Sequence, residues 1–197
     1  LAPLDRGLEP LWLRRVYLDG VRALLWVVPA LGYARFVAGA RAGEFLRLTT
    51  PVDPRGLARG GAVAGLYLGA VALVALTVEG RRFDPARAAG GAHWLASVAA
   101  LAFGCFAEEV LFRGVFLREF TTRFGFWRAD ALTSALFAAI HWPGWYAHRG
   151  LVPELVHHSF GVFTVGLLAG YLWNRTNSLW PAVAFHFANN LLVGLLS

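Results

Sequence analysis

Two adjacent glutamates follow a long apolar run in the second half of the chain, in the string Glu108-Glu109-Val-Leu-Phe-Arg113. In a helix, Glu109 and Arg113 lie one turn apart with the acid nearer the N-terminus, the better order for an ion pair. Glu108 lies about 100° further around the helix and has no such partner within it. A desolvated, unpaired carboxylate takes up a proton more readily, as a general base must. The alternative is that both acids sit at a helix end and only bind arginines.

A histidine closes the next apolar run, in Phe137-Ala-Ala-Ile-His141, and Trp142-Pro143 follow it. An imidazole exchanges protons near neutral pH, so His141 is a candidate partner for a general base. The proline predicts that the helix stops here. The alternative is a histidine at a helix end or at a membrane interface, with no part in chemistry.

The last apolar run contains His186-Phe-Ala-Asn-Asn190. His186 and Asn190 share one helix face, since they are four residues apart. Both side chains can donate hydrogen bonds to an oxyanion, as acyl-transfer sites require. The alternative is that both groups only bridge neighbouring helices, a common use of Asn and His in membrane bundles.

Three other groups suggest different chemistry. Cys105 precedes Glu108 by three residues, so it is either a small buried residue or a nucleophile beside the base. His157 and His158, shortly after Glu154, suggest a metal site, but the His-Glu-x-x-His string of helical zinc proteases is absent. No serine has the setting that a serine protease of the rhomboid type needs.

The amino-acid composition indicates whether these polar groups are surrounded by water or by lipid. The chain is 57% hydrophobic and 15% charged, with a mean hydropathy of +0.53, whereas soluble domains have about a quarter of charged residues. Lipid is therefore the main solvent, and ionisable groups at membrane depth are functional candidates. The net charge of +6 fits loops at anionic head groups. We expect no nucleic-acid partner, because no arginine stripe is interleaved with aromatics.

Six apolar stretches must position the three motifs. They run over residues 16–40, 61–78, 94–120, 131–146, 152–173 and 179–196. Residues 41–59 and 79–91 carry charges and prolines and are expected to form loops. Only helices or closed barrels satisfy the backbone in lipid. The sequence therefore predicts an all-α, polytopic transmembrane bundle of about six to eight helices, in a single integral membrane domain over residues 1–197 with the catalytic motifs in 104–190.

The order of these motifs resembles the CPBP family, the glutamic intramembrane proteases that include CAAX prenyl endopeptidases and bacteriocin-processing or immunity proteins. The family pattern is a Glu-Glu-x-x-x-Arg helix, a Phe-x-x-x-His helix and a final His-x-x-x-Asn helix. All three occur here in that order, between Glu108 and Asn190, and Ser178-Leu-Trp-Pro181 before the last motif is also similar to the family. Residues before about Trp94 add only hydrophobic helices to the match.

The resemblance implies a role for each motif. Glu108 and His141 would activate a water, and His186 and Asn190 would form the oxyanion site. Glu109 and Arg113 would hold the first helix in register. Neither a metal nor an organic cofactor is implied.

The expected function is hydrolysis of a peptide bond in a membrane-associated protein or peptide, by a multi-pass protein of the prokaryotic cell membrane. A C-terminal sorting signal, a leader peptide or a CAAX-like tail are the candidate substrates. Three alternatives remain: a non-enzymatic bacteriocin-immunity or scaffold protein, a metal-dependent membrane protease, and a small proton-coupled transporter.

Overall fold

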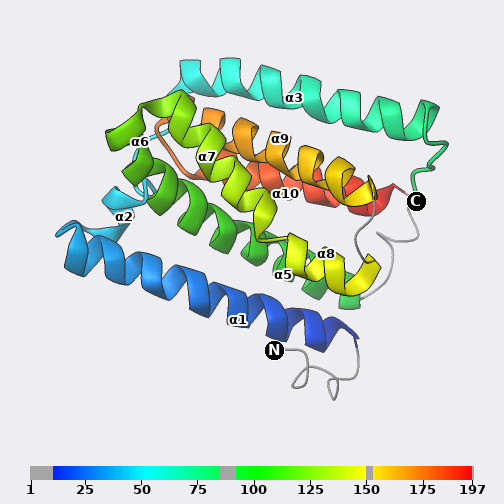
Figure 1. Ribbon diagram of the computed structural model, residues 1–197, viewed down its shortest axis with the longest axis horizontal. Helices are drawn as coiled ribbons and strands as arrows, with labels where there is room; N and C mark the ends of the chain where they lie inside the picture. Colours follow the sequence, from blue (N-terminus) through cyan, green and yellow to red (C-terminus); the bar gives the residue numbers. More distant parts are fainter. Residues whose placement is uncertain (1–10, 85–91, 150–152, 197) are drawn as a thin grey trace.

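The computed structural model describes residues 11–84, 92–149 and 153–196, which form a helical bundle with no strand among them (Figure 1). The predicted all-α class is therefore confirmed. The elements in chain order are α1 (Leu11–Gly32), the π-helical turn η1 (Tyr33–Val37), α2 (Ala42–Phe45), α3 (Pro54–Thr77), α5 (Ala92–Glu109), the π-helix η2 (Val110–Leu117), α6 (Arg118–Phe124), α7 (Phe126–Ala139), α8 (Trp142–Arg149), α9 (Pro153–Thr176) and α10 (Trp180–Leu195).

Three of the described helical segments are long and apolar enough to cross a membrane. They are Gly20–Val37, Pro54–Thr77 and Trp94–Phe124. Their outward side chains are large and apolar: Phe36 is 86% exposed and Leu66 is 77% exposed. Exposed apolar side chains of this size are disfavoured in water and suit contact with acyl chains.

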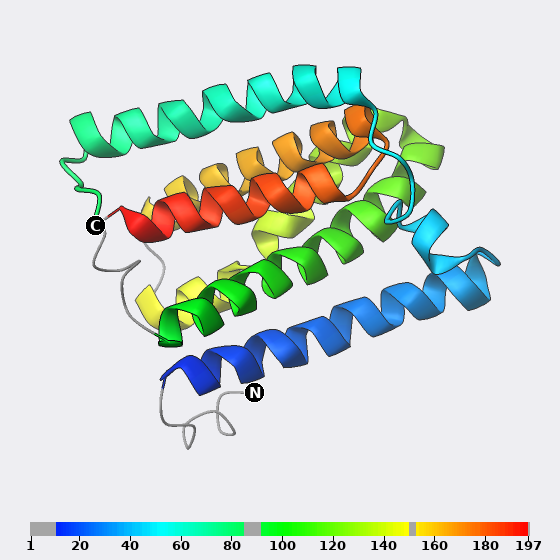
Figure 2. The same cartoon turned by 180° about the vertical axis from the view of Figure 1, so that it is seen from behind.

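The outer helices α1 and α3 lie along opposite sides of the bundle, with α5, α7, α9 and α10 between them (Figure 1). Figure 2 shows the same order from behind. Helix α1 packs on α5 and η2, while α3 packs on α9 and α10. The central pairs are α7 with α9, α9 with α10, and α5 with α10. The three motif-bearing segments thus meet in the middle layer.

Helix α3 begins earlier than the sequence predicts. Residues 54–59 were expected in a loop because of Pro51 and Pro54, but Pro54 is the first residue of the helix. Asp53 caps this end, since its two carboxylate oxygens accept from the backbone N–H groups of Arg55 and Gly56 at 3.1 Å. A proline at the first helical position lacks only an N–H that would be unpaired anyway, so it starts a helix readily.

The start of α3 is held tightly against the end of α9. A Cβ on Gly56 would lie 1.8 Å from the backbone oxygen of Arg175, so only glycine allows this approach. The backbone N–H of Asp53 also donates to the carbonyl of Thr176 at 3.0 Å. These contacts fix one end of α3 to the central layer.

The helix that carries the two glutamates runs without a break from α5 through η2 into α6. Its turns widen into a π-helix at Val110, directly after Glu108 and Glu109. Stretches of π-helix inside α-helices are uncommon and are frequent at functional sites. Sequence alone did not predict this widening.

Helix α7 ends at Ala139, two residues before His141, and α8 begins at Trp142. The expected stretch 131–146 is therefore two helices rather than one. The helix before Pro143 does stop, as predicted. Pro143 itself lies in the first turn of α8, where no intrahelical N–H bond is lost. His141 consequently sits at the junction of two helices.

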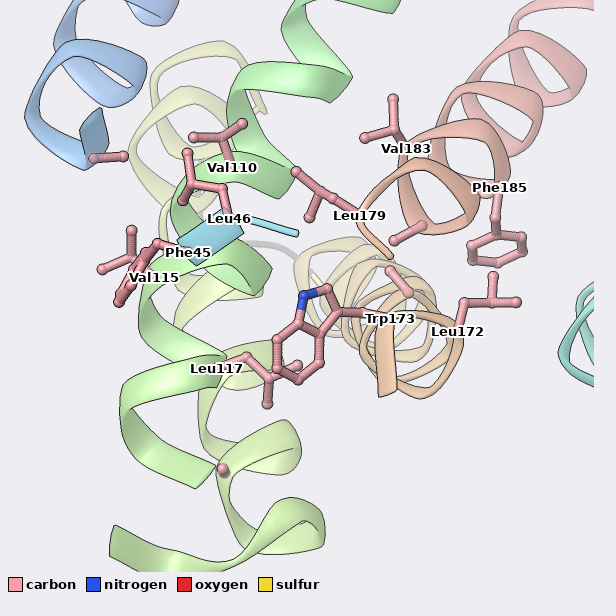
Figure 3. Close-up of a cluster of buried hydrophobic side chains, with 14 of the residues drawn as sticks. Phe45, Leu46, Val110, Val115, Leu117, Leu172, Trp173, Leu179, Val183 and Phe185 are labelled. Carbon is pink, nitrogen blue, oxygen red and sulfur yellow. The ribbon is translucent and has the colours of Figure 1, made fainter. Parts of the chain in front are cut away.

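Buried apolar side chains gather where α2, η2, α9 and the start of α10 meet, with Trp173 and Leu46 among them (Figure 3). A Cβ on Gly114 would lie 2.7 Å from Leu46 Cδ2, so Leu46 fills the space that the glycine leaves. Arg47 stacks over the Trp173 ring, 3.7 Å from its centroid. Burial, together with the positive charge of Arg118, lowers the pKa of Arg47 to about 10. This cluster anchors the loop after α2 beneath the site.

Candidate active site

Glu109 is fully buried and holds two of the predicted site residues with one oxygen. Arg113 Nη1 and His186 Nδ1 each lie 2.9 Å from Glu109 Oε1. The ion pair that the sequence predicts between Glu109 and Arg113 is therefore present, although Arg113 lies in the π-helical segment. Arg113 Nη2 also donates to the carbonyl of Gly166 at 2.8 Å, which ties the pair to α9.

Glu108 is 7% exposed and faces two helices other than its own. Its Oε2 lies 3.7 Å from His186 Nε2, and its Oε1 lies 3.5 Å from Arg22 Nη1. As predicted, no residue of its own helix pairs with it among the described contacts. Its partners come instead from α10 and from α1, so the carboxylate points into the space between these helices.

His141 is oriented by the helix that precedes it. Its Nδ1 lies 2.7 Å from the carbonyl oxygen of Phe137, and its ring packs edge-on against the Phe137 ring at 5.1 Å. Trp145 of α8 lies on the ring as well, 5.4 Å between centroids. Glu108 and His186 are close enough to act electrostatically on His141. The Phe-x-x-x-His motif thus brings His141 to the other two motifs.

The ring of Phe137 contacts both histidines. It packs edge-on against His186 at 5.5 Å and against His141 at 5.1 Å. The guanidinium of Arg113 lies 4.8 Å from the centroid of the same ring. One aromatic ring is thus packed against both imidazoles and the buried cation.

Asn190 lies beside Cys105. Its amide donates to the Cys105 sulfur at 3.6 Å, and its carbonyl oxygen accepts from Asn189 at 3.2 Å. Cys105 is 2% exposed, and its thiol has no disulfide partner. The amide of Asn190 and the Nε2 of His186 are the groups that the sequence analysis assigned to an oxyanion site.

The hydrogen bonds place a proton on the same nitrogen of both histidines. A carbonyl and a carboxylate only accept, so the Nδ1 atoms of His141 and His186 both carry the donated proton. Neutral His141 therefore presents an Nε2 lone pair that can take a proton. His186 can donate from Nε2 only when its ring carries two protons, that is, as an imidazolium.

Arg22 is a site residue that motif reasoning missed. It comes from α1, outside the three motifs, and its side chain is 41% exposed beside Glu108. The sequence does indicate that Arg22 has a partner, because an arginine within an apolar membrane helix is unfavourable without one. Which acid it meets is decided by the packing of α1 on α5.

An apolar cavity of about 740 Å³ reaches the site from the side of α3. Tyr67 and Val74 of α3, Val162 of α9 and Trp145 of α8 line it, and Asn190 lies in its wall. Its volume falls in the range of small-molecule binding pockets, which is about 300–1,000 Å³. The cavity therefore offers apolar space next to the polar groups.

The metal-dependent alternative involves Glu154, His157 and His158, and the structure describes only some of their side chains. The side chains of Glu154 and His157 are outside the described set. Within the described set, no three His, Cys, Asp or Glu side chains are grouped so that they could hold a metal ion. His158 packs on Trp145 at 5.7 Å, at the edge of the cavity.

One comparison with known proteins gives a match. A family model described as type II CAAX prenyl endopeptidase Rce1-like matches residues 90–192, which include all three motifs. No curated protein and no solved structure matches the sequence significantly. Arg22 and the α3 side of the cavity lie outside the matched region.

Proposed function

The chain belongs to the Rce1-like family of type II CAAX prenyl endopeptidases, and from this premise we propose that it hydrolyses its substrate by a glutamic mechanism. It is an integral membrane protease of CAAX type. In the proposed mechanism a water held by Glu108 and His141 is the nucleophile. His186 and Asn190 bind the oxyanion, and Glu109 with Arg113 position His186.

The first step transfers a proton from water to Glu108 while the water oxygen attacks the scissile carbonyl. The Nε2 lone pair of His141 accepts the second hydrogen bond of that water and orients it. The carbonyl oxygen becomes an oxyanion, which accepts from Nε2–H of the His186 imidazolium and from the amide of Asn190. Collapse of the tetrahedral intermediate breaks the C–N bond, and Glu108 returns its proton to the leaving amine.

Two contacts support this assignment of roles. Glu108 lies near two nitrogen-bearing groups, the imidazole of His186 at 3.7 Å and the guanidinium of Arg22 at 3.5 Å. Both can hold the carboxylate in place where it takes a proton from water. Glu109 is less suited to be the base, because it is fully buried and its Oε1 is shared by Arg113 and His186.

The apolar cavity supports a membrane-associated substrate. Its wall includes Asn190, so a peptide whose scissile carbonyl lies at Asn190 can place an apolar part in the cavity. A CAAX-like tail, a leader peptide or a C-terminal sorting signal each provides such a part. We propose that the protein crosses a prokaryotic cell membrane several times and acts there.

The observation that carries the proposal is the meeting of Glu108, His141 and His186, from three segments, beside an apolar cavity. A scaffold or immunity protein would not need a buried carboxylate 3.7 Å from a buried imidazole.

The test is cleavage of membrane-associated peptides by the purified full chain in detergent, compared with Glu108→Gln, with and without a chelator. Cleavage that resists the chelator and is lost in Glu108→Gln supports the proposal. Cleavage lost to the chelator in the wild type favours the metal-dependent alternative. Undiminished cleavage by Glu108→Gln contradicts the glutamic mechanism.

A further inference from the structure

Asp130 is a buried carboxylate that the proposed mechanism does not use. It lies in α7, one turn after the helix begins, and is 1% exposed. Neither of its carboxylate oxygens has a hydrogen-bond partner among the described residues. A buried carboxyl group without a partner is strongly unfavourable, so its surroundings must compensate for it.

Other buried polar atoms without a hydrogen-bond partner lie on α5, η2, α7 and α9. Within the described part of the chain they are Glu109 Oε2, Arg113 Nε, Ser134 Oγ and Trp173 Nε1. Three of these atoms can donate a hydrogen bond and two can accept one, since a hydroxyl does both. Together with Asp130, these unpaired donors and acceptors on α5, η2, α7 and α9 are called the polar seam below.

Close helix packing places Asp130 in this seam. A Cβ on Gly170 would lie 1.9 Å from Asp130 Oδ1, and a Cβ on Gly166 would lie 2.8 Å from Ser134 Cβ. The two glycines of α9 thus make room for the two polar residues of α7. Gly166 also accepts from Arg113 Nη2 at 2.8 Å, so the same turn of α9 contacts the buried guanidinium.

Arg113 is bonded to Glu109 and acts electrostatically on Asp130. Its Nη1 and Nη2 are bonded to Glu109 and Gly166, which leaves Nε unused. Arg113 and Glu109 are the charged groups that act on Asp130 electrostatically. One bridging water between Nε–H and an Asp130 oxygen would satisfy both groups, as buried waters commonly do.

We propose that Asp130 is a positioning residue that shares the charge of Arg113 with Glu109 and thereby holds the ring of His186 in its doubly protonated form. Asp130 does not touch the substrate. Its effect passes through Arg113 to Glu109, whose Oε1 accepts from His186 Nδ1. Its relevance to catalysis rests on the proposed function, whereas its effect on the protonation of His186 does not.

The balance of charge gives the direction of this effect. The buried acids Glu108, Glu109 and Asp130 face the two guanidinium groups of Arg22 and Arg113. When all three acids are ionised, their charge exceeds that of the two guanidinium groups by one, which an imidazolium at His186 neutralises. The titratable groups that face His186 are Glu108, Glu109 and Cys105 of α5, and His141 at the α7–α8 junction. Removing the charge of Asp130 leaves two acids and two cations, a balance that favours a neutral ring.

The experiment follows the ring nitrogens of His186 by NMR across a pH series, in the full chain in detergent with nitrogen-15-labelled histidine. The His186 signals are assigned by their loss in His186→Gln. In Asp130→Asn the ring should lose its second proton at a pH lower than in the wild type, by roughly 0.5–1 unit. This is less than the 1–3 units that a charge in direct contact produces.

Thr133→Val is the matched control. Thr133 is equally buried in α7, but its hydroxyl donates to the carbonyl of Ala129 at 2.7 Å within the helix. It should titrate as the wild type does. Asp130→Ser, which is smaller and uncharged, replaces Asp130→Asn if the latter does not fold.

An unchanged titration of His186 in the folded, uncharged Asp130 variants would overturn the proposal, even if those variants were less stable, because a merely structural role lowers stability alone. A peptidase assay on the same samples separates the two proposals. If the wild type cleaves none of the peptides, the proposed function fails while the NMR titration still decides the role of Asp130. If it cleaves them, Asp130→Asn should lose activity mainly on the alkaline side.

Discussion

His186 and Arg113 bind the same oxygen of Glu109, each at 2.9 Å. The arginine donates to this oxygen, and the oxygen in turn fixes which nitrogen of His186 carries the first proton. Glu109 and Glu108 are neighbours in sequence, yet one is committed to orienting His186 and the other faces the space beside it. Their contacts therefore predict different consequences of the same substitution.

Glu108→Gln should lower kcat by at least about 10²-fold, the scale of general-base catalysis, with little change in stability. Glu109→Gln should lower kcat as well, and it should also destabilise the protein by about 3–5 kcal/mol, because Arg113 stays buried without its partner. Thermal unfolding and peptidase assays on both variants check this contrast. Equal stability of the two variants would contradict the assignment.

Arg22→Gln should lower kcat/KM, because the guanidinium 3.5 Å from Glu108 helps to hold the catalytic carboxylate in place. The effect should be modest, since Arg22 is partly exposed. Arg35→Gln, which changes an exposed arginine in η1 just after α1, should leave kcat/KM unchanged. Steady-state peptidase assays on the two variants check this contrast.

Trp145→Ala should reduce kcat/KM roughly ten- to a hundredfold, because a small displacement of a catalytic group has an effect of this size. Trp145 packs on His141 and also lines the cavity, so both kcat and KM should change. Trp142→Phe serves as the control, since it removes only the indole bond to Ser159. Steady-state kinetics on the two variants decide the point; equal losses in both would indicate a general disturbance of α8.

Cys105→Ser and Cys105→Ala should both retain cleavage. The sulfur accepts from the amide of Asn190 and is buried, a supporting position for which no covalent step is proposed. Serine can accept the same hydrogen bond, so it should preserve activity better than alanine does. Loss of all activity in both variants, with folding intact, would instead favour Cys105 as the nucleophile.

Gly56→Ala should destabilise the protein by about 1–3 kcal/mol, as overpacking of a fixed contact does. The new Cβ would meet the backbone oxygen of Arg175 at 1.8 Å, and backbone cannot yield as a flexible side chain can. Gly61→Ala, in the same helix with no atom within 4 Å, should be neutral or slightly stabilising. Unfolding of both variants in detergent compares them directly.

The sequence predicts the local features of the site well. The pair of Glu109 and Arg113 follows from a four-residue spacing, and it persists although the helix widens there. The start of α3 was wrong because Pro54 was interpreted as a helix breaker, whereas it occupies the first turn, where proline is tolerated. The stop before Pro143 was right, but the sequence did not predict that α8 begins there.

Contacts between distant segments could not be predicted in the same way. No spacing rule connects Glu108 with Arg22, which is in another helix, or Glu109 with His186, 77 residues away. The sequence analysis assigned Asn190 to an oxyanion site but did not indicate its contact with Cys105. Asp130 was not singled out, because one acid near the start of an apolar stretch resembles an ordinary helix end. These features depend on how the helices pack.

The contact of Leu46 with Gly114 has a consequence for how the chain can be divided. The family match begins at residue 90, but Leu46, which fills the space over Gly114, precedes it. An excised fragment starting there would uncover that hollow and would also lack Arg22. The matched half is therefore not a self-sufficient unit, and catalytic competence should return only when the two halves are expressed together and reassemble.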